Sequence, residues 1–172
     1  VSRGFPWGCR RDRPPWRADM PCLGAQREIV NTLPTPSNLT AKTAKFFADG
    51  VIEGGTAAML DEYSDHPGYH GMPVWDLPSL IEAVVAFDAA GFQIFVHAIG
   101  DAGIRSSLDA IEAAVLRNPP RDRRPVVTHI QLLDPSDLPR FRKLGVIANF
   151  EPLWTCLDPM QVVLSVPRLG TE

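Results

Sequence analysis

The sequence predicts an α/β protein in which strands alternate with helices along the chain. Residues 91–101, GFQIFVHAIGD, alternate between apolar and other side chains, a period that is typical of a strand. The residues that follow carry apolar side chains at spacings of three and four, which is typical of one face of a helix. Because the same unit recurs, and parallel strands need crossovers between them, a parallel sheet is expected.

Four strands and three helices are expected, in the order strand, long loop, helix, strand, helix, strand, helix, strand. The first, third and fourth strands fall at Ala44–Asp49, Pro125–Gln131 and Val146–Glu151, and the second follows Gly91. An aspartate stands where each helix should begin, at Asp76, Asp101 and Asp134. Aspartate favours this position because its carboxylate accepts hydrogen bonds from the first backbone N–H groups. Gly91, Asn118 with two prolines, and Gly145 mark the expected helix ends.

Composition narrows the classes of protein. At 172 residues, with 45% hydrophobic and 22% charged residues, the chain is long enough for one domain with a real core. The net charge of −3 argues against a general nucleic-acid binder and against a polybasic membrane contact. No signal peptide and no long apolar run is seen. Three scattered cysteines, Cys9, Cys22 and Cys156, are typical of reduced thiols in a cytoplasmic protein.

Residues 1–36 differ from the rest of the chain. They hold six arginines, no lysine and six of the 17 prolines, and proline at this density opposes regular helices and central strands. We interpret them as an irregular lead-in, with a short helix over Ala25–Leu33, before an α/β domain at residues 37–172. Arginines beside Phe5, Trp7 and Trp16 also allow a nucleic-acid arm, which is the less favoured reading. The start at Val1 suggests a segment of a longer protein.

Lys45, His97 and His129 are the candidate metal ligands. Each is expected on the inward face of a successive strand. Alone, each has an ordinary explanation as a hydrogen-bonded or edge residue. Together they indicate a metal site, because neutral imidazoles bind zinc and other divalent ions well. A buried lysine with a depressed pKa can also react with carbon dioxide, and the resulting carbamate could bridge two metals.

This placement bears on the architecture. A doubly wound sheet and a (β/α)8 barrel both fit the alternation of strands and helices. No glycine-rich phosphate turn opens a helix, which weakens a nucleotide-binding sheet. Polar residues at the carboxyl ends of strands favour the barrel, although four strands are half of the eight that it needs. The long loop Glu53–Trp75 should line the pocket through Tyr63 and Tyr69, since long loops in compact domains are often functional.

Three blocks resemble amidohydrolase family 3, which includes N-substituted formamide deformylase. They are AKFFADGVIEGGTAAML, GFQIFVHAIGDAGIRSSLDAIEAA and RPVVTHIQLLDPSDLPRFRKLGVIANFEPLW. The resemblance covers roughly residues 40–170. It implies a TIM barrel, here strands four to seven, and hydrolysis of carbon–nitrogen bonds other than peptide bonds in a small amide-like molecule. It also implies a site for a divalent metal, with zinc as the expected ion. The ligands would be His97, His129 and Lys45, the last as a carbamate.

The chain also departs from the family pattern. The superfamily uses a His-x-His pair after strand one and a proton-shuttling aspartate after strand eight, and neither is found here. The catalytic proton carrier is therefore unassigned, and the segment alone is not expected to turn over substrate. Open strand edges would favour pairing with a second copy. Two rivals stay open: a dihydroorotase-like or phosphotriesterase-like hydrolase, and a degenerate barrel segment that only binds or scaffolds.

Overall fold

The computed structural model describes residues 27–28, 30–32, 40–151, 159 and 161–170. The chain divides into two units, Val1–Lys42 and Thr43–Glu172. In the first unit, residues 27, 28, 30 and 31 are helical, and the N–H of Thr32 donates to the carbonyl of Glu28. This agrees with part of the helix expected over Ala25–Leu33. The rest of the lead-in and the three cysteines lie outside the described residues.

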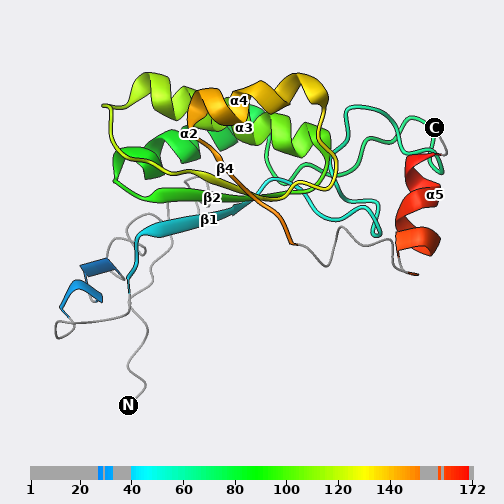
Figure 1. Ribbon diagram of the computed structural model, residues 1–172, viewed down its shortest axis with the longest axis horizontal. Helices are drawn as coiled ribbons and strands as arrows, with labels where there is room; N and C mark the ends of the chain where they lie inside the picture. Colours follow the sequence, from blue (N-terminus) through cyan, green and yellow to red (C-terminus); the bar gives the residue numbers. More distant parts are fainter. Residues whose placement is uncertain (1–26, 29, 33–39, 152–158, 160, 171–172) are drawn as a thin grey trace, which may run out of the picture. The chain divides into compact units, whose positions relative to one another are not determined.

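The second unit is built on a four-stranded parallel sheet with the order β1-β2-β3-β4 (Figure 1). The strands are β1 (Thr43–Phe47), β2 (Gln93–Ala98), β3 (Val126–His129) and β4 (Ile147–Asn149). The predicted α/β class, the four strands and their parallel pairing are confirmed. Each neighbour in sequence is also the neighbour in space, so all four carboxyl ends meet at one edge of the sheet.

Helices cover one face of this sheet. They are α2 (Leu77–Ala89), α3 (Asp101–Arg117) and α4 (Leu138–Leu144), which follows the short 3-10 turn Pro135–Asp137. Figure 1 shows the three helices as a layer over the strands. Val96 and Val127 from the sheet and Ile104 and Leu108 from α3 are completely buried. Near the end of the chain, a π-helical turn (Gln161–Ser165) leads into α5 (Val166–Leu169).

The opposite face of the sheet is largely open. Phe47 and Ile147 are about half exposed on it, at 52% and 46%, and Lys45 is also exposed. Lys45 thus lies on the face away from the helices, which it shares with His97, but its side chain is exposed in the described chain and not buried as expected. The reason is that β1 is an edge strand whose only described partner is β2, and no described helix of this unit covers Lys45.

Two of the three aspartates expected to cap helix N-termini, Asp76 and Asp134, do so. The carboxylate of Asp76 accepts from the N–H of Ser79 at 2.9 Å, and that of Asp134 accepts from Ser136 at 2.8 Å. Gly145 ends α4 in the left-handed conformation, φ 65°, which glycine adopts without a Cβ penalty. Asp101 is not a cap, because Gly100 occupies that position. Its carboxylate instead accepts from the N–H of Leu60 at 2.8 Å and so fastens the long loop to α3.

The spacing of Leu138, Phe141 and Leu144 in the sequence would place all three on the buried side of α4, but the structure differs. Phe141 is buried, but Leu138 is 61% exposed. The 3-10 turn before α4 changes the phase of the helix, so Asp137 faces α3 in place of Leu138. Asp137 is 3% exposed and binds the guanidinium groups of Arg105 at 2.8 Å and Arg140 at 3.0 Å.

A buried carboxylate ties α2 to the segment that follows α3. Asp88 is 2% exposed and pairs with Arg121 and with Arg123, the latter at 3.1 Å. We expect Asp88→Ala to lower the free energy of unfolding by about 3–5 kcal/mol, the usual cost of breaking a buried ion pair. Urea denaturation would measure this. The matched control is Asp122→Ala, which breaks a pair whose two side chains are 71% exposed and should change stability by less than about 1 kcal/mol. Equal losses in the two variants would contradict this assignment.

In the part of the chain that the structure describes, no helix combines the length and apolar character needed to cross a membrane.

Candidate metal centre

The carboxyl-terminal edge of the sheet carries most of the candidate residues. In the sheet register, Phe47 pairs with His97, and His97 pairs with Thr128, which pairs with Asn149. Paired residues of parallel strands point to the same side, so these four share the open face. The edge is therefore lined by side chains that the sequence places far apart. Enzymes built on parallel (β/α) sheets carry their catalytic groups at this edge.

His129 reaches the site through an unusual backbone conformation. Strand alternation alone would put Val127 and His129 on the same face, and Val127 lies beside Val96 on the helix-covered face. By the same alternation His129 would also point toward the helices. However, His129 and Ile130 have φ angles of 80° and 51°, which break the alternation. The His129 ring consequently packs edge-on against the His97 ring, with 4.5 Å between the ring centroids.

Glu151, just after β4, holds the His129 ring. Its Oε2 lies 3.0 Å from Nδ1 of His129, and its Oε1 accepts from the hydroxyl of Thr128 at 2.9 Å. Since a carboxylate only accepts, Nδ1 carries the proton and the lone pair falls on Nε2. Desolvation lowers the pKa of His129 below its usual value, against the effect of Glu151. The ring is therefore neutral near pH 7, as a metal ligand must be.

His97 is fixed from the other side by the segment after β1. Its Nε2 lies 2.9 Å from the carbonyl of Gly50 and 3.6 Å from the carboxylate of Asp49. Both partners are acceptors, so Nε2 carries the proton and the lone pair falls on Nδ1. Asp49 itself is fully buried and accepts from the backbone N–H groups of Ala58, Ile99 and Gly100 at 2.8–3.0 Å. Burial raises the pKa of Asp49, whereas these donors and His97 act to lower it.

Lys45 lies on the same open face, two residues before Phe47. Its ammonium is 4.4 Å from the centroid of the Phe95 ring and 5.1 Å from that of Phe47. Desolvation against this apolar surface lowers the pKa of Lys45, and the carboxylate of Glu151 partly offsets the effect. A lowered pKa increases the fraction of neutral amine, which is the form that reacts with carbon dioxide.

These residues suit a divalent metal in part. The rings of His97 and His129 are in contact, and each ring has one nitrogen lone pair that could bind a metal ion. His129 also has a carboxylate partner, Glu151, as metal-bound histidines usually do. No cluster of three or more His, Cys, Asp or Glu side chains is found among the described residues. The two imidazoles, with Lys45 as a carbamate, would therefore hold such an ion together with ligands from elsewhere.

Removing the Glu151 carboxylate is expected to weaken metal binding by the full-length protein. Loss of such a supporting partner typically costs 10–100-fold in metal affinity, and we expect about this loss for Glu151→Ala. Glu151→Gln, which retains an acceptor, should lose less. Competition with a chromogenic chelator would measure both variants. Glu62→Gln, a change in an exposed loop carboxylate, serves as control, and unchanged affinity in Glu151→Ala would exclude the supporting role.

Tyr63 and Tyr69 occupy the long loop as expected, but Tyr63 is 1% exposed. Its hydroxyl donates to the carbonyl of Ala57 at 2.8 Å, and burial raises its pKa to about 12. The Tyr69 ring lies 5.7 Å from that of Tyr63 and stacks on His66 at 4.7 Å. The structure gives Tyr63 a packing role in the loop, and substrate binding by the two tyrosines stays a prediction.

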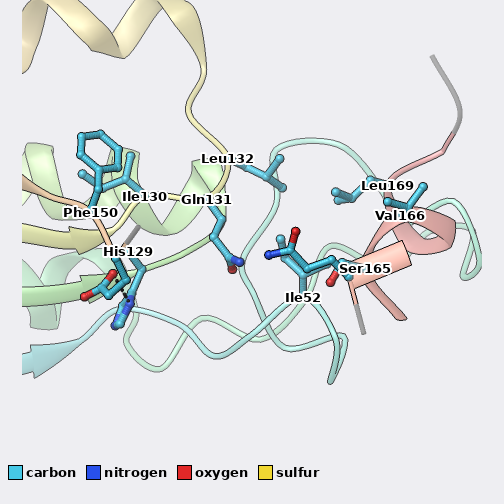
Figure 2. A pocket seen from close by; sticks show the side chains of 11 residues that line it. Ile52, His129, Ile130, Gln131, Leu132, Phe150, Ser165, Val166 and Leu169 are labelled. Carbon is cyan, nitrogen blue, oxygen red and sulfur yellow. Dashed lines mark hydrogen bonds and ion pairs between the residues drawn. The ribbon is translucent and has the colours of Figure 1, made fainter. Parts of the chain in front are cut away.

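A cavity of about 270 Å³ opens beside His129 (Figure 2). Six apolar side chains line it: Ile52, Ile130, Leu132, Phe150, Val166 and Leu169. Its polar lining includes His129, Glu151 and Gln131. Glu151, Asp49 and Gln131 are not among the site residues that the sequence predicts. The sequence feature that could have indicated them is their position, because each lies two residues after the carboxyl end of a strand.

Comparisons with known proteins identify the family of the chain. Residues 17–172 match the amidohydrolase family (Amidohydro_3), and the chain belongs to this family. The putative amidohydrolase YtcJ of Bacillus subtilis is 31% identical over 128 residues, which are 74% of this chain and 23% of that protein. Protein LONG AFTER FAR-RED 3 of Arabidopsis thaliana is 36% identical over 128 residues, 74% of this chain and 21% of that protein.

Two crystal structures of uncharacterized metal-dependent hydrolases are similar in fold. The one from Pyrococcus horikoshii is 26% identical with a TM-score of 0.68, over 87% of this chain and 29% of that chain. The one from Pyrococcus furiosus is 25% identical with a TM-score of 0.66, over 86% of this chain and 30% of that chain. The chain thus spans under a third of each of these relatives.

Proposed function

We propose that this chain forms the central part of a metal-dependent hydrolase that cleaves carbon–nitrogen bonds, other than peptide bonds, in small amide-like molecules. The observation that carries the proposal is the His97–His129 pair, with ring centroids 4.5 Å apart, at the carboxyl ends of neighbouring strands. Membership of the amidohydrolase family and the similarity to metal-dependent hydrolases support it. An N-substituted formamide is the first substrate type to test.

The proposed architecture is a TIM barrel of which this chain supplies strands four to seven. Two features support a barrel over a doubly wound sheet. The strand order follows the sequence without reversal, and the three described connecting helices lie over one face (Figure 1). A doubly wound sheet reverses its order and carries helices on both faces. In a barrel, the open face with Lys45 and Phe47 would become the filled interior.

The residues of the candidate metal centre would have different roles in this reaction. His97 and His129 would hold zinc or a similar ion, which when bound lowers the pKa of water and polarises a carbonyl. Glu151 keeps the proton of His129 on Nδ1, and Gly50 keeps that of His97 on Nε2. Lys45 is the candidate for carbamylation. The group that passes a proton to the leaving amine is not among these residues.

Metal removal and a matched pair of substrates test the proposal. The full-length protein should hydrolyse an N-substituted formamide, lose this activity when a chelator removes the metal, and regain it with zinc. The corresponding formate ester and a phosphotriester should be poorer substrates. Preferred cleavage of either would favour a different metal-dependent hydrolase. A metal-free protein without hydrolytic activity would favour a scaffold.

A further inference from the structure

The cavity beside His129 contains a buried acceptor that the protein leaves unused. Oε1 of Gln131 is buried, and no group in the described part of the chain donates a hydrogen bond to it. Figure 2 shows the Gln131 side chain extending from the end of β3 toward Ile52. A buried polar atom without a partner costs about 1–3 kcal/mol, and such exceptions call for a specific explanation. A ligand N–H group would satisfy this acceptor.

The surroundings of Gln131 limit the ligand further. Six of the eleven lining side chains are apolar, and neither lysine nor arginine is among the lining residues that the structure describes. Glu151 is paired with His129, and the hydroxyl of Ser165 donates to Glu53 at 2.9 Å. None of the described lining side chains therefore carries a positive charge that would neutralise an anionic group. At about 270 Å³, it lies at the small end of ligand pockets.

We propose that this cavity is the specificity subsite for a compact, neutral apolar substituent of the substrate, and that Oε1 of Gln131 accepts a hydrogen bond from a substrate N–H group. The proposal rests on the proposed function and narrows its substrate class to amides or ureido compounds that carry an N–H. Gln131 is thus a specificity-determining residue, separate from the histidines that would hold the metal. Tertiary amides and esters lack the donor and leave the acceptor unsatisfied.

Two small ligands of nearly equal shape test the proposal at equilibrium. N-Methylisobutyramide carries one N–H group, and N,N-dimethylisobutyramide carries none. Binding of each to the full-length protein would be followed by NMR chemical-shift titration. We expect the first to bind about fivefold to tenfold more tightly, the value of about one hydrogen bond. Gln131→Met keeps a similar shape without the acceptor and should abolish the preference.

Gln93→Met is the matched control. It makes the same change at the opposite end of the sheet, where Gln93 contacts Thr43 and Arg124, and it should retain the preference. Equal affinities of the two ligands in the unaltered protein, no binding of either, or an unchanged preference in Gln131→Met would overturn the proposal. The ligand comparison needs no variant, so it holds even where Gln131→Met does not fold.

This test separates the subsite from the proposed function. Hydrolysis of amides without any preference for an N–H would overturn the role of Gln131 and leave the hydrolase intact. A preference that depends on Gln131, in a protein that hydrolyses no amide, would support the subsite and contradict the hydrolase.

Discussion

Replacing Lys45 with alanine in the full-length protein is expected to abolish metal binding and amide hydrolysis together. Lys45 lies on the open face of β1 with its amine over the rings of Phe95 and Phe47, and desolvation lowers its pKa. If its carbamate is a metal ligand, the loss should exceed the 10–100-fold cost of removing a supporting residue. Metal analysis after dialysis and a single-substrate rate assay would measure both losses.

Short carboxylic acids distinguish a ligand from a structural lysine. Acetate or propionate could occupy the space vacated in Lys45→Ala and supply the missing carboxylate oxygens, so partial recovery of both metal and rate is expected. Lys143→Ala is the control, because that lysine makes an exposed contact with Glu112 and should be neutral. Full metal content and full rate in Lys45→Ala would show that Lys45 is only an exposed cation on an aromatic surface.

Asp49→Ala is expected to cause the largest loss of stability. The fully buried carboxylate accepts from three backbone N–H groups, those of Ala58, Ile99 and Gly100. Alanine would leave all three buried donors unsatisfied, at about 1–3 kcal/mol each. A loss of about 3–9 kcal/mol is a large part of the roughly 5–15 kcal/mol by which domains are usually stable. Urea denaturation followed by circular dichroism would measure it.

Two further variants test whether the loss of stability in Asp49→Ala comes from the hydrogen bonds of the Asp49 carboxylate. Asp49→Asn retains one acceptor oxygen and should lose less, about 1–3 kcal/mol. Asp61→Ala removes an exposed carboxylate of the long loop and should change the free energy of unfolding by no more than about 0.5 kcal/mol. Since Asp49 also lies 3.6 Å from Nε2 of His97, the asparagine variant should weaken metal binding as well. A stability loss for Asp49→Ala no larger than that for Asp61→Ala would show that these bonds contribute little.

Local physical signals are sufficient to predict most of the fold. Apolar alternation locates the four strands, and the capping carboxylates of Asp76 and Asp134 locate two helix starts, because these effects depend on neighbouring residues alone. The exposure of Leu138 could not be predicted. It depends on the extra 3-10 turn, which is stabilised by contacts of Asp137 with Arg105 and Arg140 from distant or later parts of the chain.

The candidate site is harder to predict, because it depends on long-range pairing. Strand alternation correctly places His97 on the open face, but it fails for His129, whose left-handed backbone turns the ring back toward His97. Glu151 is 22 residues from His129 in sequence, and only the parallel register brings them together. The exposure of Lys45 likewise follows from its edge position in the sheet, which the sequence of one strand does not reveal.

X-ray absorption spectroscopy at the zinc edge would show directly whether His97 and His129 hold a divalent ion. The full-length protein should contain stoichiometric metal with imidazole nitrogens at about 2.0–2.1 Å. The His97→Ala and His129→Ala variants should each lose this scattering, whereas His70→Ala, in the long loop, should retain it. A spectrum without imidazole ligands, or one left unchanged when both histidines are replaced, would contradict the metal centre proposed here.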